Sequence, residues 1–359
     1  MKRCVLILLM VVSVLSLALT QCAPSPTPTP QVVVKQQTVV VKQTVVVPEK
    51  AKGGVQYVWS TCLIIPFFID PQKGAARAAE ELGVNYQWLA PAEVSIPKHI
   101  EFAESALSYP GIKGMTINAC DAHAYDGVIK RALEQGVAVA TWGGCEDERP
   151  ELQLAPICFI GNMKTIGKNC ATRLAKEMGE QGEVVIAIDF LEDINQEWRR
   201  VGFVEEMAKN HPNIKIVDTY KDCGDAEGSV RCAEQAVSAH PSVKGYFCTG
   251  AMGGVGPASV FPKAGRTDIK VSAADTDPAI LDGVRKGTIT FTYSQAPYIS
   301  GYLGVYLPYL MAEKGLKPTK KVLDLPVTFV DKNNVDKYDK DILVSLLEIK
   351  KYVDEVLMK

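Results

Sequence analysis

The stretch IKGMTINACDAHAYDGVIKRALEQGVAVATW, residues 112–142, contains the pattern on which this chain is built. It begins with an apolar run, Ile112–Ile117, and ends with another, Val137–Trp142. Between them His123–Gln135 has the spacing of an amphipathic helix, and Gly136 follows as a residue suited to a helix C-terminus. Short apolar runs are typical of strands that are buried on both faces. The stretch therefore predicts two parallel strands joined by a crossover helix.

The same alternation extends in both directions from this stretch, starting at Gln56. Further strands are predicted at Gln56–Thr61, Asn85–Leu89, Val184–Asp189, Ile214–Thr219, Val243–Cys248, Ile269–Ala274 and Ile289–Tyr293. Further helices are predicted at Pro71–Leu82, Pro97–Leu107, Thr165–Met178, Gln196–Lys209, Glu227–Ala239 and Pro278–Lys286. Asp70 before Pro71 is predicted to cap the first of these helices. In a chain of 359 residues, this pattern predicts an α/β fold with two doubly wound parallel-sheet lobes.

Composition and motifs argue against several classes of protein. The net charge is −2, whereas a nucleic-acid partner would favour a strongly basic surface. The four histidines accompany no nucleophile elbow or paired carboxylates, so no catalytic residue and no enzyme activity are predicted. No CxxC pair is present, and the glycines between Gly250 and Gly256 lack the spacing and the lysine of a phosphate loop. We therefore expect no metal, no cofactor and no nucleic acid.

The N-terminal segment indicates export. Residues 1–21 have the charged start and apolar run of a signal peptide, and this run is too short for a confident membrane span. The ending Leu19-Thr20-Gln21-Cys22 resembles a bacterial lipoprotein box, which predicts lipidation of Cys22 and attachment to a membrane. Gln21 departs from the small residue usual there, and an ordinary signal peptide is the alternative. Residues 22–53, rich in proline and in repeated valines, are predicted to be a low-complexity tether.

Export also makes disulfides possible. Of the 10 cysteines, Cys4 lies in the signal peptide and Cys22 is the predicted lipid site. The pair Cys145 and Cys158, like the pair Cys223 and Cys232, brackets a loop and could form a bridge, but connectivity does not follow from sequence. The remaining four are expected to be small core residues: Cys62, Cys120, Cys170 and Cys248.

Candidate binding residues follow the predicted strands, because ligands of open parallel sheets bind beyond the carboxyl ends of the strands. These residues are partly aromatic and partly polar, which suits a small hydroxylated ligand. They are Phe67 and Phe68, Asn118 and Asp121, Trp142, Arg199, Gly250, Asp275 and Gln295. Asp121 has a second interpretation, as the cap of the helix that begins near His123.

Several short segments in this order resemble the ribose-binding-like family of type I periplasmic solute-binding proteins. They include Pro66-Phe67-Phe68, Ile117-Asn118-Ala119-Cys120-Asp121, Arg199-Arg200-Val201-Gly202-Phe203, Ala274-Asp275-Thr276 and Ser294-Gln295. The resemblance covers residues 55 to about 335. It implies two lobes joined by a three-segment hinge near Gly161, Gln295 and Pro326. The implied N-terminal lobe is residues 54–161 and 296–326, and the C-terminal lobe is residues 162–295 and 327–359, ending in a helix.

The resemblance also implies roles for individual residues. Phe67 and Phe68 would stack on the ligand, and Arg199, Asp275 and Gln295 would hydrogen-bond to it. Three positions depart from the family pattern, because this chain has Leu63-Ile64-Ile65, Trp142-Gly143-Gly144 and Thr249-Gly250 where relatives carry polar side chains. The resemblance therefore implies a ligand with fewer or differently placed hydroxyls.

The function implied by the resemblance is capture of a monosaccharide or polyol by a monomeric, lipid-anchored, extracytoplasmic protein. The captured solute would pass to the membrane permease of an ABC importer. A sensory or signalling receptor subunit that binds a sugar-like signal is the alternative. The sequence separates neither these two functions nor the identity of the ligand.

Overall fold

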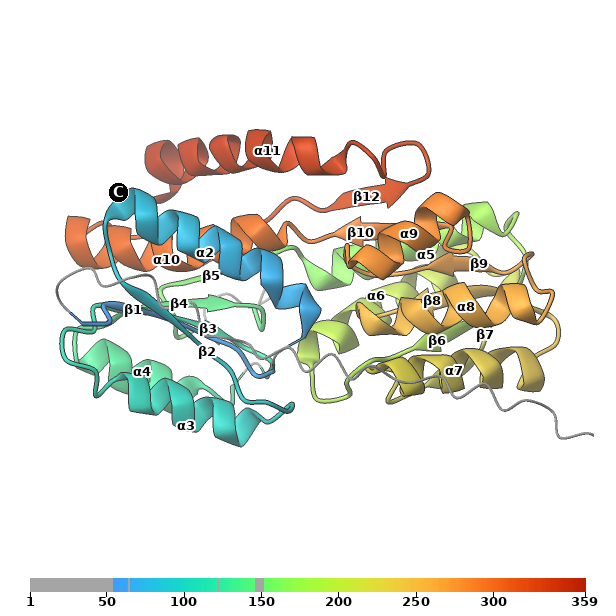
Figure 1. The fold of residues 1–359 in the computed structure, drawn as a ribbon, viewed down its shortest axis with the longest axis horizontal. Helices are drawn as coiled ribbons and strands as arrows, with labels where there is room; N and C mark the ends of the chain where they lie inside the picture. Colours follow the sequence, from blue (N-terminus) through green and yellow to red (C-terminus); the bar gives the residue numbers. More distant parts are fainter. Residues whose placement is uncertain (1–53, 64, 122, 146–151) are drawn as a thin grey trace, which may run out of the picture. The chain divides into compact units, whose positions relative to one another are not determined.

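The computed structural model describes residues 54–359, except 64, 122 and 146–151. The predicted signal peptide, tether and Cys22 therefore lie outside the described residues. The described part contains two six-stranded sheets (Figure 1). The first has the order β11-β5-β4-β3-β1-β2. Its strands are β1 (Tyr57–Ser60), β2 (Tyr86–Leu89), β3 (Gly114–Asn118), β4 (Ala138–Trp142), β5 (Ile157–Ile160) and β11 (Val322–Asp324).

The second sheet repeats this arrangement, with the order β12-β10-β9-β8-β6-β7. Its strands are β6 (Gly182–Ala187), β7 (Ile214–Tyr220), β8 (Val243–Cys248), β9 (Lys270–Ser272), β10 (Phe291–Ser294) and β12 (Thr328–Asp331). Strand pairs in both sheets are parallel, apart from the antiparallel pairing of β10 with the edge strand β12. The predicted fold class, two parallel-sheet α/β lobes, is confirmed. We call them the N-lobe and the C-lobe.

Alternate side chains of the N-lobe strands pack on opposite faces of the sheet. Tyr57 and Trp59 of β1 belong to the core under α2 (Ile69–Leu82) and α10 (Pro297–Lys314). Val58, between them, packs with residues of α3 (Ile96–Ala106) and α4 (Asp126–Glu134). Both faces are apolar because helices cover both, which explains the continuous apolar runs in the sequence.

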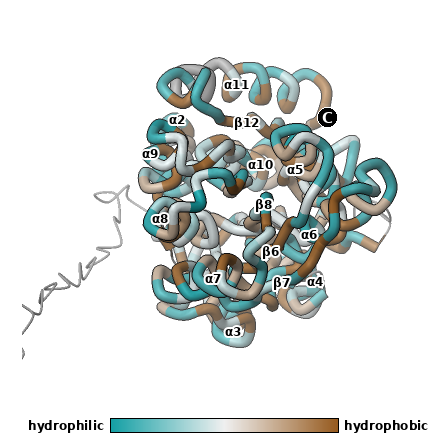
Figure 2. The backbone as a smooth tube through the Cα atoms, turned by 90° about the vertical axis from the view of Figure 1, so that its right-hand side faces the viewer, coloured by the Kyte–Doolittle hydropathy of each residue, from teal (hydrophilic) through white to brown (hydrophobic). Residues whose placement is uncertain are grey.

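The C-lobe has the same layers. Val184 and Ile186 of β6 pack with Phe203, on the face covered by α5 (Met163–Glu177) and α6 (Ile194–Asn210). Val185 packs on the opposite face, where the helices are α7 (Ala226–Ala239), α8 (Val255–Lys263) and α9 (Pro278–Lys286). Figure 2 shows the strands β6 and β8 lying between these two groups of helices.

The chain crosses between the lobes at three places. These are residues 161–162 between β5 and α5, residues 295–296 between β10 and α10, and residues 325–327 between β11 and β12. The lobe boundaries expected after residues 161, 295 and 326 lie in these segments. Because each lobe takes one strand, β11 or β12, from the C-terminal part of the chain, neither sheet consists of one continuous segment.

The C-terminal helix departs from the expected division, which placed residues 327–359 with the C-lobe. Only β12 joins the C-lobe sheet, whereas α11 (Tyr338–Tyr352) and the π-helical turn Val353–Leu357 return to the N-lobe. There the hydroxyl of Tyr306 on α10 donates to Asp354, and the Lys350 ammonium lies 5.2 Å from the Tyr306 ring centre. Tertiary contacts with α10 thus decide where this helix lies.

Some elements were not predicted. The strand β5 and the helices α8 and α10 were missed, and α10 shows why: it is buried on nearly all sides and so lacks amphipathic spacing. The predicted cap at Asp70 is wrong, because a turn of 3₁₀ helix at Pro66–Phe68 leads into α2, which begins at Ile69. Asp70 lies in the first turn instead, where a carboxylate is still favourable.

The structure contains three disulfides: Cys62–Cys120, Cys145–Cys158 and Cys223–Cys232. The last two pairs are those that bracket loops in the sequence. The expectation of core thiols at Cys62 and Cys120 is wrong, because the loops after the neighbouring strands β1 and β3 bring these two residues together. Cys170 and Cys248 are buried free thiols.

Candidate ligand-binding site

A pocket lies where the carboxyl ends of the two sheets face each other. In each sheet the first strand of the lobe pairs with the second on one side and the third on the other, which is the strand order that opens a crevice for ligands. The N-lobe wall of the pocket consists of Leu63, Ile65, Phe67, Phe68, Asn118, Cys120, Trp142 and Ile160. The C-lobe wall consists of Asp189, Phe190, Asp193, Asn195, Gln196, Arg199, Gly250, Ala251, Asp275 and Gln295. The cavity volume is about 70 Å³, which suits a small molecule and excludes an oligosaccharide.

All of the predicted binding residues except Asp121 line this pocket. The carboxylate of Asp121 instead accepts hydrogen bonds from the backbone N–H groups of His123 and Ala124, at 2.9 and 2.7 Å. This geometry agrees with the capping interpretation of Asp121.

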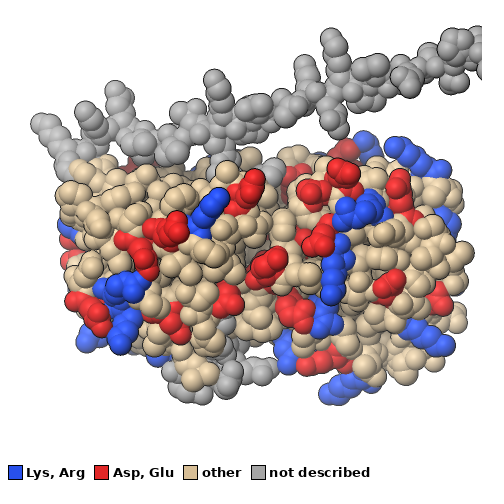
Figure 3. All heavy atoms as spheres, turned by 90° about the horizontal axis from the view of Figure 1, so that it is seen from below, with Lys and Arg blue, Asp and Glu red and all other residues tan. Residues whose placement is uncertain are grey.

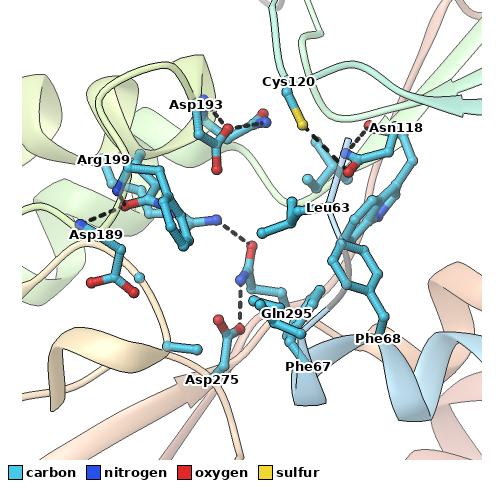
Figure 4. A pocket seen from close by; sticks show the side chains of 18 residues that line it. Leu63, Phe67, Phe68, Asn118, Cys120, Asp189, Asp193, Arg199, Asp275 and Gln295 are labelled. Carbon is cyan, nitrogen blue, oxygen red and sulfur yellow. Dashed lines mark hydrogen bonds between the residues drawn. The ribbon is translucent and has the colours of Figure 1, made fainter. Parts of the chain in front are cut away.

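Three C-lobe side chains form a connected chain of hydrogen bonds (Figure 4). Arg199 Nη2 donates to Gln295 Oε1 at 2.7 Å, and Gln295 Nε2 donates to Asp275 Oδ1 at 2.6 Å. Arg199 also donates through Nη1 to the Thr249 carbonyl and through Nε to the sulfur of Met163. Each of these groups is positioned by another, so the site is rigid before any ligand arrives.

Asp275 occupies an unusual environment. Its backbone has φ = 63°, the left-handed region that aspartate tolerates better than most residues. Burial raises the pKa of its carboxyl to about 6, although the Arg199 charge and the Gln295 hydrogen bond act in the opposite direction. Its Oδ2 accepts no hydrogen bond from the described residues, so this oxygen is available to a ligand.

Asp189 differs from Asp275 because its oxygens are already occupied. Oδ2 accepts from the backbone N–H of Met252 and Oδ1 from that of Gly253, at 2.8 and 2.9 Å. Burial raises the pKa of its carboxyl to about 7, against the effect of these two bonds. Asp189 therefore orders the turn after β8 and contributes less to direct ligand contact.

The N-lobe wall contains a cluster of aromatic rings. The rings of Phe67 and Trp142 are stacked, with centres 5.8 Å apart and an angle of 16° between their planes. Phe68 meets Trp142 edge-to-face at 6.2 Å. Phe68 and Trp142 are almost fully buried, whereas Phe67 is half-buried. Phe67 is therefore the ring with the most room to contact a ligand, and Phe68 is largely a core residue.

Contacts also cross directly from one lobe to the other. Asn195, in the first turn of α6, accepts from the Gly144 N–H at 3.0 Å and donates to the Ala119 carbonyl at 3.4 Å. The neighbouring Ile194 N–H donates to the Cys120 carbonyl at 3.0 Å. Gly143 and Gly144 both have positive φ, and a Cβ on Gly143 would lie only 2.9 Å from the Asn195 amide. The lobes are therefore in a closed arrangement, which depends on these glycines.

Several pocket residues were not predicted. Asp193 and Asn195 follow β6 at the start of α6, so the rule that ligands lie beyond strand ends would have found them. Leu63, Ile65 and Cys120 carry no polar signal and are brought to the site by the loops after β1 and β3. None of the described residues form a group of three or more His, Cys, Asp or Glu side chains suited to a metal ion. No helix within the described ranges is long and apolar enough to span a membrane.

Comparisons with known proteins agree with this geometry. A family model described as a periplasmic binding protein domain matches residues 58–316. The ribose import binding protein of Salmonella typhimurium is 26% identical over 290 residues, covering 80% of this chain and 93% of its own length. The xylose/arabinose-binding protein of Sulfolobus acidocaldarius is 24% identical over 288 residues, covering 76% of this chain and 70% of its own length.

Solved structures show the same fold. An ABC transporter solute-binding protein from Burkholderia graminis, in complex with D-arabinose, has a TM-score of 0.74 and 28% sequence identity. The match covers 81% of this chain and 99% of that protein. The family consists of extracytoplasmic substrate-binding proteins rather than enzymes. Since the family model covers most of the chain and the two-lobed fold agrees, this chain belongs to the periplasmic binding protein family.

Proposed function

We propose that this protein captures a monosaccharide or related polyol outside the cytoplasm and delivers it to the permease of an ABC importer. The observation that supports this most directly is the pocket, in which Arg199 and Asp275 of one lobe face the Phe67 and Trp142 rings of the other. An arginine and a carboxylate together satisfy both hydrogen-bonding senses of a hydroxyl pair. Aromatic rings cover the C–H face of a sugar ring. Relatives named for ribose, xylose and arabinose support a ligand of this class.

Capture proceeds by closure of the two lobes. A ligand that touches both walls binds the closed state better than the open one and shifts the population towards closure. The three crossover segments at 161–162, 295–296 and 325–327 provide the hinge. Ala296 in the second segment has φ = 53°, so this hinge position already has an uncommon backbone conformation.

Binding occurs without turnover. The polar groups of the pocket are acceptors and donors fixed by one another, and no histidine is among the residues that line it. Isothermal titration against a panel of pentoses and hexoses is expected to give one site per chain, with a monomeric protein and no product after prolonged incubation. Steady product formation in proportion to pure protein would contradict the proposal.

Transport and sensing are separated by an uptake measurement. Deleting the gene is expected to abolish uptake of the radiolabelled ligand, because the permease then receives no loaded binding protein. Normal uptake in the deletion strain, together with loss of a transcriptional or motile response to the same sugar, would favour the sensory alternative.

Lipid anchoring at Cys22 belongs to the same proposal. The support is the lipobox-like sequence Leu19-Thr20-Gln21-Cys22 and the proline-rich tether that follows it. Replacing Cys22 with Ala is expected to release the protein from the membrane fraction, because stable attachment requires the acyl chains. Full retention of the Cys22→Ala protein in membranes would show that another segment anchors it.

A further inference from the structure

The two walls of the pocket differ in polarity more than a fully hydroxylated sugar requires. Every acidic and basic side chain that lines the pocket belongs to the C-lobe: Asp189, Asp193, Arg199 and Asp275. The N-lobe wall is made mainly of aliphatic and aromatic side chains. Figure 4 shows Leu63 lying between the hydrogen-bonded chain of the C-lobe and Asn118.

The hydrogen-bonding capacity of the N-lobe wall is small. Asn118 uses its Nδ2 to donate to the Trp142 carbonyl at 3.0 Å, and its Oδ1 lies 3.5 Å from the sulfur of Cys120. Cys120 is in a disulfide and therefore has no S–H to donate. Trp142 is 4% exposed, and its indole Nε1 has no partner among the described residues. This wall thus offers little more than one indole donor and one amide to a ligand.

The capacity of the C-lobe wall is larger and faces one side of the ligand. Arg199 has five N–H groups, of which three are used within the protein, and Asp275 keeps Oδ2 available. These groups suit adjacent hydroxyls on one edge of a sugar. A hydroxyl on the opposite edge would be buried against Leu63 and Ile65 without a partner, which weakens binding by about tenfold or more.

We propose that the ligand is a deoxy monosaccharide, with hydroxyls towards Arg199 and Asp275 and a methyl or methylene group against Leu63 and Ile65. This inference rests on the proposed function, since it specifies which monosaccharides the pocket selects. A carbon without its hydroxyl gains apolar contact with the N-lobe wall and leaves no polar group unsatisfied. Leu63 and Ile65 are then specificity-determining residues, which discriminate against the parent sugar.

Matched pairs of sugars test this preference, because the members of each pair differ by one hydroxyl. Suitable pairs are L-rhamnose with L-mannose, L-fucose with L-galactose, D-fucose with D-galactose, and 2-deoxy-D-ribose with D-ribose. Isothermal titration of the purified protein is expected to show one deoxy sugar binding about tenfold or more tightly than its parent. If parents bind equally or more tightly in every pair, this inference is wrong and monosaccharide capture stands. If no sugar of the series binds, both the inference and the proposed class of ligand are wrong.

A change to the N-lobe wall provides the second test. Leu63→Asn adds a donor and an acceptor to the apolar wall, so it is expected to reduce the preference for the deoxy sugar by about tenfold, mainly by tighter binding of the parent. Leu63→Met keeps the wall apolar and is expected to retain the wild-type preference. Melting temperatures of both variants check that they fold. An unchanged preference in folded Leu63→Asn would show that this wall does not select the ligand.

Discussion

The N-lobe and the C-lobe present the same architecture and opposite chemistry to the pocket. Both sheets have the same strand order and both pocket walls follow strand ends. Yet the C-lobe wall carries a hydrogen-bonded chain from Arg199 to Asp275, whereas the N-lobe wall carries a stack of Phe67 on Trp142. The difference shows that the fold determines where the pocket lies, while the few residues after each strand determine what it binds.

Outside the pocket the surface shows no such separation. On the face seen in Figure 3, Lys and Arg side chains are interspersed with Asp and Glu. A surface of this kind does not concentrate one sign of charge, so the polarity difference between the walls is a property of the pocket rather than of that face as a whole.

The largest effect is expected from the polar wall. Arg199→Ala removes the centre of the hydrogen-bonded chain and should weaken ligand binding by roughly a hundredfold or more, because hydrogen bonds to charged groups are worth about 1.5–3 kcal/mol each. The matched control is Arg200→Ala on the same helix, since Arg200 pairs with Glu197 and does not line the pocket. Titration calorimetry and melting temperature are measured for both. Equal affinity of the two variants would show that the polar wall does not hold the ligand.

The next effect concerns pH. The folded-state pKa of Asp275 is raised from 3.8 to about 6, so the native state holds this proton more tightly than the unfolded chain does. The contribution of Asp275 to stability is therefore complete below about pH 4 and is lost as the pH rises through 6. Asp275→Asn abolishes this loss, and its stability relative to wild type should rise by about 2–3 kcal/mol between pH 4 and pH 7.

Denaturant unfolding of the ligand-free proteins at several pH values measures this difference. Asp189 has the same direction of shift but is present in both proteins, so it cancels from the comparison. A stability difference that does not change with pH would mean that the carboxyl of Asp275 is not destabilised by burial.

A smaller effect is expected where the two walls touch. Asn195→Ala removes the side-chain hydrogen bonds to Gly144 and Ala119, so the open state should become more populated and the apparent affinity should fall by about tenfold. Small-angle X-ray scattering of the ligand-free protein should give a larger radius of gyration. Asn210→Ala, at the exposed end of the same helix, is the control. The same radius for wild type and Asn195→Ala would contradict a role in closure.

The smallest effect is expected from the apolar wall. Phe67→Leu keeps the wall apolar and removes only the aromatic face, which should weaken binding by about fivefold and leave the melting temperature unchanged. Phe102→Leu replaces an exposed phenylalanine that does not line the pocket and should have no effect on affinity. A loss of affinity larger than that of Arg199→Ala would reverse the ranking of the two walls.

The sequence was most informative where local rules operate. The alternation of apolar runs and amphipathic helices predicted most of both sheets, and the rule of strand ends predicted Phe67, Trp142, Arg199 and Asp275 in one pocket. It failed for α10, whose burial on nearly all sides removes the helical period, and for the pairing of Cys62 with Cys120. Both failures depend on neighbours that are distant in the chain.

The sequence by itself therefore determined the βα alternation, the two-lobed class and most of the side chains that line the pocket, because these follow from periodicity and from order along the chain. Only the tertiary structure decided that Gln295 links Arg199 to Asp275, that Asn195 bridges the lobes and that α11 returns to α10. The physical reason is that these features join residues up to about a hundred positions apart. Their energy depends on distance and burial, and both exist only after the sheets have formed.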